Sequence, residues 1–142
     1  MKLYRVLALA LAVVMMGCVL VACDKEPEAT ETTIKVAFTI KDGADKDSEI
    51  LAQDAEYSYT YTGDAAPTVI EVLADVCEFY ELKIEYQSEE QQYIKSIGGK
   101  SAGSGKFWNY SQNGVTDKEE PMYVQTVADG DILVVYLADT KK

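Results

Sequence analysis

The chain contains no histidine, and this absence removes the side chain most often used as a general base near neutral pH. No serine, lysine or aspartate stands in a recognisable nucleophile motif either. The 24 acidic residues could place two carboxylates together, but their spacing distinguishes no pair. We therefore expect a protein that has no catalytic activity, no cofactor and no metal centre.

Cysteine is scarce as well, and the chain has only Cys18, Cys23 and Cys77. The first two lie at the end of an apolar run, residues 6–21, which follows Lys2 and is shorter than the roughly 20 residues that a membrane-spanning helix needs. A short basic segment followed by such a run is typical of a secretory signal peptide. The sequence thus predicts export from the cytoplasm.

The residues around Cys23 favour a lipoprotein signal. Leu20-Val21-Ala22-Cys23 resembles the lipobox, in which the thiol accepts a diacylglyceryl group and a small residue precedes the cleaved bond. A competing cut before Cys18 fits the pattern less well, and a buried or disulfide-bonded Cys23 is the alternative without lipidation. We expect residues 1–22 to be the signal peptide and Cys23 to carry the lipid.

Cleavage before Cys23 would leave Cys77 as the one thiol of the folded part, so that no intramolecular disulfide could form. The mature chain would contain eleven lysines, no arginine and all 24 acidic residues, a formal charge of −13. Such a surface repels phosphate backbones and anionic membranes. Nucleic acid is therefore excluded as a partner, and the lipid itself would anchor the protein at the extracytoplasmic face of the cell membrane.

Residues 23–32 form a polar segment without large apolar groups, which we expect to be a flexible tether. About 110 residues follow, enough for one domain over residues 33–140. In residues 33–40 apolar and polar side chains alternate, which predicts a strand with one buried face. After a charged loop over residues 41–53, residues 56–62 alternate in the same way and predict a second strand.

A helix is predicted to begin at Thr68, because Thr68 and Glu71 have capping-box spacing. Its apolar residues recur at intervals of three and four and would face the sheet; they are Val69, Val72, Leu73, Val76, Cys77 and Tyr80. Further strands are predicted at residues 82–86, 93–97, 107–112, 122–126 and 132–137, with a flexible loop at residues 101–105. This order predicts an α+β fold of β-grasp type, a mixed sheet packed on one main helix.

Four segments together resemble the transcobalamin-like C-terminal domain family, a branch of the soluble-ligand-binding β-grasp superfamily and a domain of unknown function in bacteria. They are residues 68–73, Tyr93-Ile94-Lys95-Ser96-Ile97-Gly98-Gly99, Trp108-Asn109-Tyr110-Ser111-Gln112-Asn113-Gly114 and Asp129-Gly130-Asp131. The resemblance covers nearly everything after Thr33. It implies a β-grasp fold and binding of a small ligand such as a corrinoid.

The candidate ligand-binding residues come from the aromatic segment near the predicted flexible loop: Phe107, Trp108, Asn109, Tyr110 and Asn113. Trp108 and Tyr110 share one face of their strand, while Phe107 and Asn109 share the other. The aromatic rings either pack against the helix or form a stacking platform for a planar or sugar-like ligand, with Asn109 and Asn113 as hydrogen-bonding groups. Both interpretations remain open at this point.

The acidic loop from Asp45 is similar to a calcium loop, and Glu56 stands at its twelfth position. Ile50 stands where such a loop requires glycine, and no helices are predicted on either side, so a solvated loop is the favoured interpretation.

The sequence as a whole predicts a membrane-anchored, extracytoplasmic module that binds a small ligand. The alternative is a module for protein interaction or adhesion in a bacterial surface assembly, which would meet its partner through an exposed sheet edge or the acidic surface.

Overall fold

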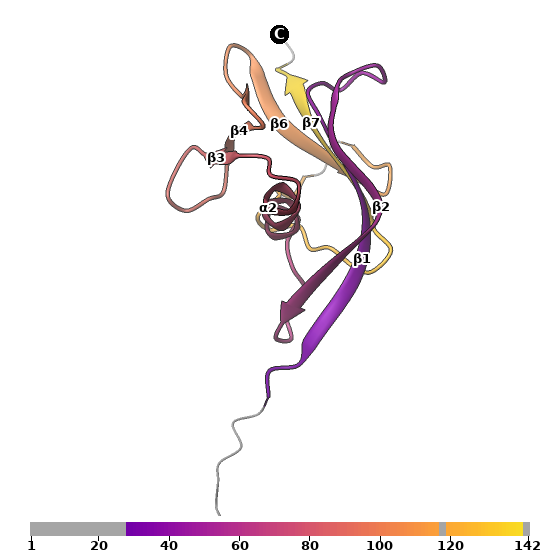
Figure 1. Ribbon diagram of the computed structural model, residues 1–142. Coiled ribbons are helices and arrows are strands. Elements are labelled where there is room, and N and C mark those ends of the chain that lie inside the picture. Colours follow the sequence, from indigo (N-terminus) through magenta and orange to yellow (C-terminus); the bar gives the residue numbers. More distant parts are fainter. Residues whose placement is uncertain (1–27, 117–118, 141–142) are drawn as a thin grey trace, which may run out of the picture.

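The computed structural model describes residues 28–116 and 119–140. The predicted signal peptide, residues 1–22, and the lipidation site Cys23 lie outside the described residues. The elements, labelled as in Figure 1, are β1 (Glu31–Lys41), β2 (Ile50–Thr62), α2 (Val69–Phe79), β3 (Ile84–Tyr86), β4 (Ile94–Ile97), β5 (Lys100–Ser101), β6 (Lys106–Gln112) and β7 (Ile132–Asp139).

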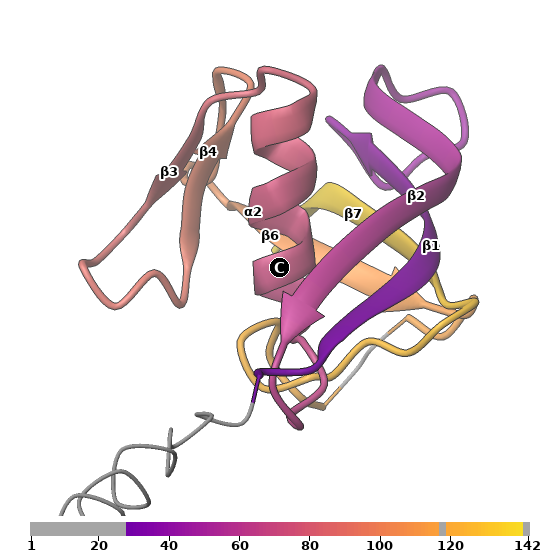
Figure 2. The same ribbon diagram turned by 60° about the horizontal axis from the view of Figure 1, so that its bottom comes forward.

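Two sheets enclose one helix (Figures 1 and 2). The larger sheet has the order β2-β1-β7-β6, in which β1 and β7 run parallel and the other neighbours run antiparallel. The smaller sheet has the order β3-β4-β5. Helix α2 lies between them and covers one face of the larger sheet (Figure 2). The predicted α+β fold with one main helix on a mixed sheet is confirmed.

Strand β1 alternates as predicted, because Ile34, Val36, Phe38 and Ile40 are all buried on the helix side. It begins at Glu31 rather than Thr33, so the last two residues of the predicted tether pair with β2 instead. Strand β2 begins earlier than predicted as well, at Ile50, and shortens the charged loop after β1. The observed strands are longer than the predicted ones because the β1–β2 pairing extends past the alternating apolar residues on which the prediction depended.

Helix α2 begins where the capping box predicted, with Thr68 as its N-cap. The main-chain N–H of Thr68 donates to the Glu71 carboxylate at 2.7 Å. Two more N–H groups of the first turn, on Val69 and Ile70, donate to the main-chain oxygens of Gln125 and Met122 at 2.8 and 3.0 Å. The first turn is thereby joined to a segment some 50 residues later in the chain.

Residues 122–126 were predicted to be a strand, and this prediction was wrong. They form a turn, in which the N–H groups of Val124 and Gln125 donate to the Pro121 oxygen at 2.9 and 3.0 Å. Only Thr126 makes a bridge, with Thr68. The alternation of Met122, Val124 and Thr126 imitates a strand, but the carbonyl groups of Met122 and Gln125 accept hydrogen bonds from the first turn of α2 instead of from a neighbouring strand.

The residues between β4 and β6 also differ from prediction. Ser101, assigned to a flexible loop, belongs to β5, which pairs with β4 after the tight turn at Gly98 and Gly99. Both glycines have positive φ, 56° and 80°, which matches the predicted turn.

The core of the described residues lies between α2 and the larger sheet. Cys77 is buried in it, and this burial raises the pKa of its thiol to about 12. No helix in residues 28–116 and 119–140 is long and apolar enough to cross a membrane.

Candidate functional site

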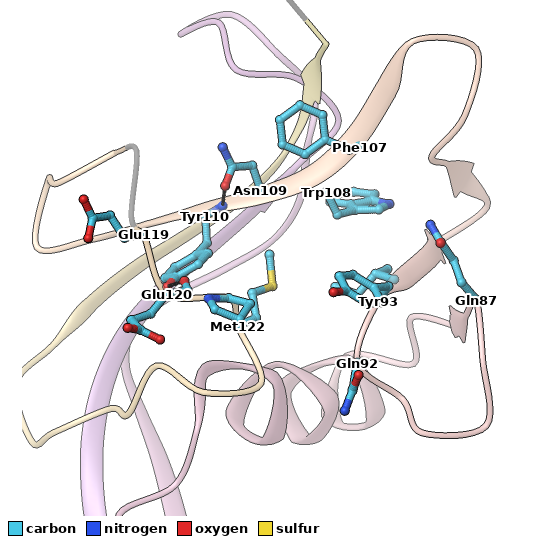
Figure 3. A pocket seen from close by; sticks show the side chains of 12 residues that line it. Gln87, Gln92, Tyr93, Phe107, Trp108, Asn109, Tyr110, Glu119, Glu120 and Met122 are labelled. Atoms are coloured by element: carbon cyan, nitrogen blue, oxygen red, sulfur yellow. Dashed lines mark hydrogen bonds between the residues drawn. The ribbon is translucent and has the colours of Figure 1, made fainter.

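An open pocket of about 260 Å³ lies beside β6, between that strand, the residues before β4 and residues 119–122 (Figure 3). Its walls therefore come from three parts of the chain that are distant in sequence. The lining residues are Gln87, Gln92, Tyr93, Ile94, Phe107, Trp108, Asn109, Tyr110, Glu119, Glu120, Pro121 and Met122. We call this the aromatic pocket.

Strand β6 forms one wall and is an edge strand of the larger sheet. The Trp108 and Tyr110 side chains lie on the helix side of β6 and are both buried, Trp108 with 8% exposure. The Tyr110 hydroxyl donates to the main-chain oxygen of Glu120 at 2.5 Å, which holds the segment around Glu120 against the strand. Burial, and next the Glu120 charge, raise the pKa of Tyr110, so its hydroxyl stays protonated at neutral pH.

The indole Nε1 of Trp108 is buried and has no hydrogen-bond partner among the described residues. In Figure 3 this nitrogen is at the end of the ring that faces Gln87. A buried N–H donor without an acceptor costs on the order of 1–3 kcal/mol. Such groups are rare in native structures and are one sign of a site that receives a missing partner, such as a ligand or a water molecule.

The opposite wall contains Tyr93, which is 55% exposed and makes an edge-to-face contact with Tyr123 at 5.8 Å between ring centroids. Tyr93 also bounds the loop before β4, because its main-chain oxygen accepts from the Gln87 N–H at 2.8 Å. The hydrogen bond between the two tyrosines, and next the charge of Tyr93, raise the pKa of Tyr123. An exposed aromatic ring at the rim is well placed to contact a bound molecule.

Among the described residues the charged part of the lining is acidic, Glu119 and Glu120, and none of the described lysines lines the pocket. Amide groups of Gln87, Gln92 and Asn109 supply the neutral polar part of the lining. Such a surface suits a ligand that has an apolar or aromatic body and hydrogen-bonding edges, and it disfavours an anion.

The pocket is smaller than the ~300–1,000 Å³ of most enclosed small-molecule sites. A large planar ligand would therefore contact the rim and the walls while one of its faces stayed in solvent or met a second protein surface. This geometry agrees with a domain that covers one side of its ligand.

The structure distributes the five predicted ligand-binding residues over three places. Phe107, Trp108, Asn109 and Tyr110 all border the aromatic pocket. The side chains of Trp108 and Tyr110 lie on one side of the β6 ribbon, and those of Phe107 and Asn109 lie on the other (Figure 3). Phe107 and Asn109 thus border the pocket from the strand edge and also face the outer side of the sheet.

Asn113 does not line the pocket. It occupies the turn after β6 with φ 53°, its Nδ2 donates to Asp131 at 2.7 Å, and its Oδ1 accepts from the Ile132 N–H at 2.9 Å. The carboxylate of Asp131 also accepts from Gln112 Nε2 at 2.6 Å and from the Ala128 N–H at 2.8 Å. In this structure Asn113 holds the turn to the loop before β7.

Tyr93, Glu120 and Met122 are pocket residues that the sequence did not single out. Tyr93 was placed at the start of a strand, where it is instead an exposed ring, and Met122 was assigned to a strand that does not form. The one available signal was the aromatic residue Tyr93 directly before β4. This residue indicates a pocket only once the fold has placed β4 opposite β6.

The acidic loop offers no closed ligand set. Asp42 and Glu49 both bond the Lys100 ammonium, at 2.9 and 2.8 Å, and Glu56 lies in β2 beside Lys35 at 3.7 Å. The Glu49 and Asp42 hydrogen bonds raise the pKa of Lys100. Within the described ranges no three acidic or cysteine side chains gather as metal ligands would.

Comparisons with known proteins found one family model and a set of solved structures. Residues 66–119 match the sequence model of a family described as a domain of unknown function, DUF4430. This segment contains α2, β6 and the pocket residues from Gln87 to Glu119. No curated protein matches the chain.

Among 17 matching chains of solved structures, two illustrate the likeness. One is a candidate metal-binding protein from Ruminococcus gnavus ATCC 29149, with 18% identity and a TM-score of 0.46 over 75% of this chain and 97% of that one. The other is haptocorrin in complex with Cbi, with 16% identity and a TM-score of 0.51 over 78% of this chain but only 26% of that one. At such identities the likeness concerns the fold alone, and it identifies an α+β domain that resembles the transcobalamin C-terminal domain.

Proposed function

We propose that this chain is a non-catalytic binding module, held by a lipid at Cys23 on the extracytoplasmic face of the cell membrane, that captures a small planar ligand in the aromatic pocket. The observation that carries the proposal is the buried Trp108 Nε1, which has no partner in the described part of the chain and belongs to the pocket wall. A ligand acceptor would complete its hydrogen bonding. The aromatic walls would supply most of the contact area.

A corrinoid is the first ligand to test. Haptocorrin, whose fold this domain resembles over 26% of its length, was solved with Cbi bound. A corrinoid has a large planar body with amide-bearing edges, which suits an open pocket with aromatic walls and neutral amide groups. The two carboxylates of the described lining, Glu119 and Glu120, argue for such a ligand over a phosphate or a nucleotide.

Titration calorimetry of residues 24–142 against cobalamin, cobinamide and a small glycan panel tests this proposal. Saturable binding is expected for a corrinoid, and Trp108→Ala should abolish it while circular dichroism shows a folded variant. Val115→Ala is the matched control, because Val115 is an exposed apolar residue outside the pocket. Absence of heat with every ligand would reject small-ligand capture.

Lipid anchoring is tested separately. Expression of the full chain with a labelled fatty acid should place label on the protein and the protein in the membrane fraction. Cys23→Ser should lose both, while Cys77→Ser, which changes a buried thiol, should keep both. Unchanged labelling of Cys23→Ser would contradict anchoring at that residue.

A protein-interaction module is the second candidate, and the free edge of β6 favours it. The Asn113 N–H donates to Ile132 and the Thr140 N–H donates to Gly105, so odd-numbered residues of β6 exchange hydrogen bonds with β7. The main-chain groups of Trp108 and Tyr110 therefore point away from β7, and the Tyr110 N–H is taken by the Asn109 side chain at 2.9 Å. An extended peptide could pair with the remaining groups. Cross-linking from Asn109→Cys in the native envelope should then yield one defined adduct, and its absence would count against this candidate.

A further inference from the structure

Phe107 and Asn109 occupy the face of the larger sheet opposite α2. Phe107 pairs across the strands with Ala138, and Asn109 pairs with Tyr136. Residues directly opposite each other in an antiparallel pair project to the same face. These four side chains therefore form one surface on the outer face of the sheet, separate from the buried side chains of Trp108 and Tyr110, which project toward α2.

This surface is hollowed. A depression of about 600 Å³ is lined by these four residues, by Asp139 and Thr140 at the end of β7, and by Ala44 of the loop after β1. Its volume lies within the ~300–1,000 Å³ typical of small-molecule sites and exceeds that of the aromatic pocket. Ala138 is small and lies between the larger Phe107 and Tyr136, so we expect the depression to be deepest at Ala138.

Hydrogen bonds to main-chain groups of β6 and Gly105 orient two of the polar side chains that line the hollow. Asn109 Oδ1 accepts from the Tyr110 N–H at 2.9 Å, which leaves its Nδ2 as the end of the amide that can donate to a ligand. The Thr140 hydroxyl donates to the Gly105 oxygen at 2.9 Å and so offers its lone pairs as acceptors. The carboxylate of Asp139 adds a strong acceptor. The hollow thus presents a donor and two acceptors around two aromatic rings.

The charges exclude several ligand classes. No lysine or arginine among residues 28–116 and 119–140 lines the hollow, and the nearby Lys41 Nζ is bonded to the main-chain oxygens of Ala44 and Asp45 at 3.5 and 3.1 Å. An anion would meet the Asp139 carboxylate, and none of these described lysines would compensate the repulsion. A wholly apolar ligand would remove the Asp139 carboxylate from water without a hydrogen bond in return.

We propose that this outer hollow is a second binding site, for the ring of a neutral saccharide. A pyranose ring has an apolar C–H face that can lie against Phe107 or Tyr136, and hydroxyl groups at its edge that can pair with Asn109, Asp139 and Thr140. A pyranose ring therefore offers a flat apolar surface to the aromatic rings of the hollow and hydroxyl donors to its acceptors. The site goes beyond the proposed function, because it uses the opposite face of β6. It shares Phe107 and Asn109 with the border of the aromatic pocket but does not include Trp108.

The exposure of Phe107 supports the proposal. Phe107 is 40% exposed on the strand whose neighbouring aromatic residues, Trp108 and Tyr110, are almost fully buried. Its place in the lining of the hollow puts this exposed ring where a stacking contact with a ligand can form.

The test is a titration of isotope-labelled residues 24–142 with cellobiose, maltose and chitobiose, followed by amide chemical shifts. One of these probes should shift the amides of Phe107, Asn109, Tyr136 and Asp139 saturably and leave the indole resonance of Trp108 unchanged. Phe107→Ala should weaken that binding about tenfold or more. Asp139→Asn, which keeps the shape of the side chain, should weaken it as well.

Ile132→Ala is the matched control, because Ile132 lies on the same outer face but at the far end of β7, outside the hollow. It should leave the affinity unchanged within about twofold. The proposal is overturned if none of the three probes gives saturable shifts, if the shifts centre on Trp108, or if Phe107→Ala and Ile132→Ala have equal effects. The Trp108 indole resonance, which belongs to the aromatic pocket alone, separates these results from corrinoid binding.

Discussion

Strand β7 contributes side chains to both faces of the larger sheet, and the two faces have different surroundings. In β7 the side chains that point to α2, Leu133, Val135 and Leu137, are all buried. On the outer face of the same strand Ile132 is 52% exposed, and Tyr136 is half-buried. Strand β7 is apolar on both sides, and within residues 28–116 and 119–140 the helix covers its inner side. We therefore expect the inner face to contribute most to the stability of the domain and the outer face to tolerate substitution better.

The edge of the sheet belongs to neither face. At β6 the aromatic pocket combines side chains from the inner face, main-chain groups of an edge strand and residues of two loops. The same packed core can thus support two proposed binding surfaces, the aromatic pocket and the outer hollow, which use different side chains apart from Phe107 and Asn109. Substitutions that separate stability from binding test this division.

The largest effect is expected in the core. Ile40→Ala on the inner face should lower the free energy of unfolding by ~2–5 kcal/mol, because it leaves a cavity beside α2. Ile132→Ala on the outer face should change it by less than about 0.5 kcal/mol. Urea denaturation of both variants measures the difference, and equal losses would mean that the outer face is covered in solution.

The buried thiol predicts a loss of stability in alkali. The pKa of Cys77 is raised from 9.0 to about 12 in the folded state, so the unfolded state releases its proton first. The contribution of the neutral thiol is complete below pH 9 and is lost as pH rises through about 12, at up to ~1.4 kcal/mol per pH unit.

Cys77→Ala should flatten this dependence over the same window, whatever it does to stability at neutral pH. Denaturation curves between pH 8 and pH 11 measure the slope in both proteins. If the slopes are the same, the thiol is not buried in the folded state as the structure has it.

An intermediate effect is expected at the turn that fixes the end of β6. Asp131→Ala should cost ~1–3 kcal/mol, because it leaves the buried Gln112 amide and the Ala128 N–H without their carboxylate partner. Asp64→Ala, at an exposed position, should have almost no effect. Thermal unfolding compares the two, and an equal response would show that the network around Asp131 does not stabilise the turn.

The smallest effect is expected at the start of α2. Glu71→Ala removes the acceptor for the Thr68 N–H and should cost ~0.5–2 kcal/mol. Glu78→Ala, at the other end of the same helix, removes a negative charge from the end where the helix dipole disfavours it and should be neutral or slightly stabilising. Helix content and unfolding curves distinguish the two, and a loss in Glu78→Ala as large as in Glu71→Ala would contradict the capping role.

The regular part of the fold could be predicted because its signals are local. The alternation along β1 and the spacing of Val72, Val76 and Cys77 on α2 each depend on one face meeting the core. The opposite orientation of Phe107 and Trp108 followed from the same alternation. The capping pair Thr68 and Glu71 fixed the start of the helix.

The pocket could not be predicted to the same extent, because its walls are brought together by long-range contacts. Met122 alternates with Val124 as a strand would, but its carbonyl group binds the first turn of α2. Tyr93 lines the pocket only because the smaller sheet packs opposite β6. Asn113 has the residue type of a ligand contact and is held instead by Asp131, a partner 18 residues away.

The most direct test of the central claim uses Trp108, the only tryptophan of the chain, as its own reporter. Cobinamide titrated into residues 24–142 should quench the fluorescence of Trp108 saturably, beyond the quenching of free N-acetyltryptophanamide measured at the same concentrations. Tyr93→Ala, which removes the opposite wall, should shift the curve to higher concentration. Quenching equal to that of the free indole, without saturation, would contradict ligand capture in the aromatic pocket.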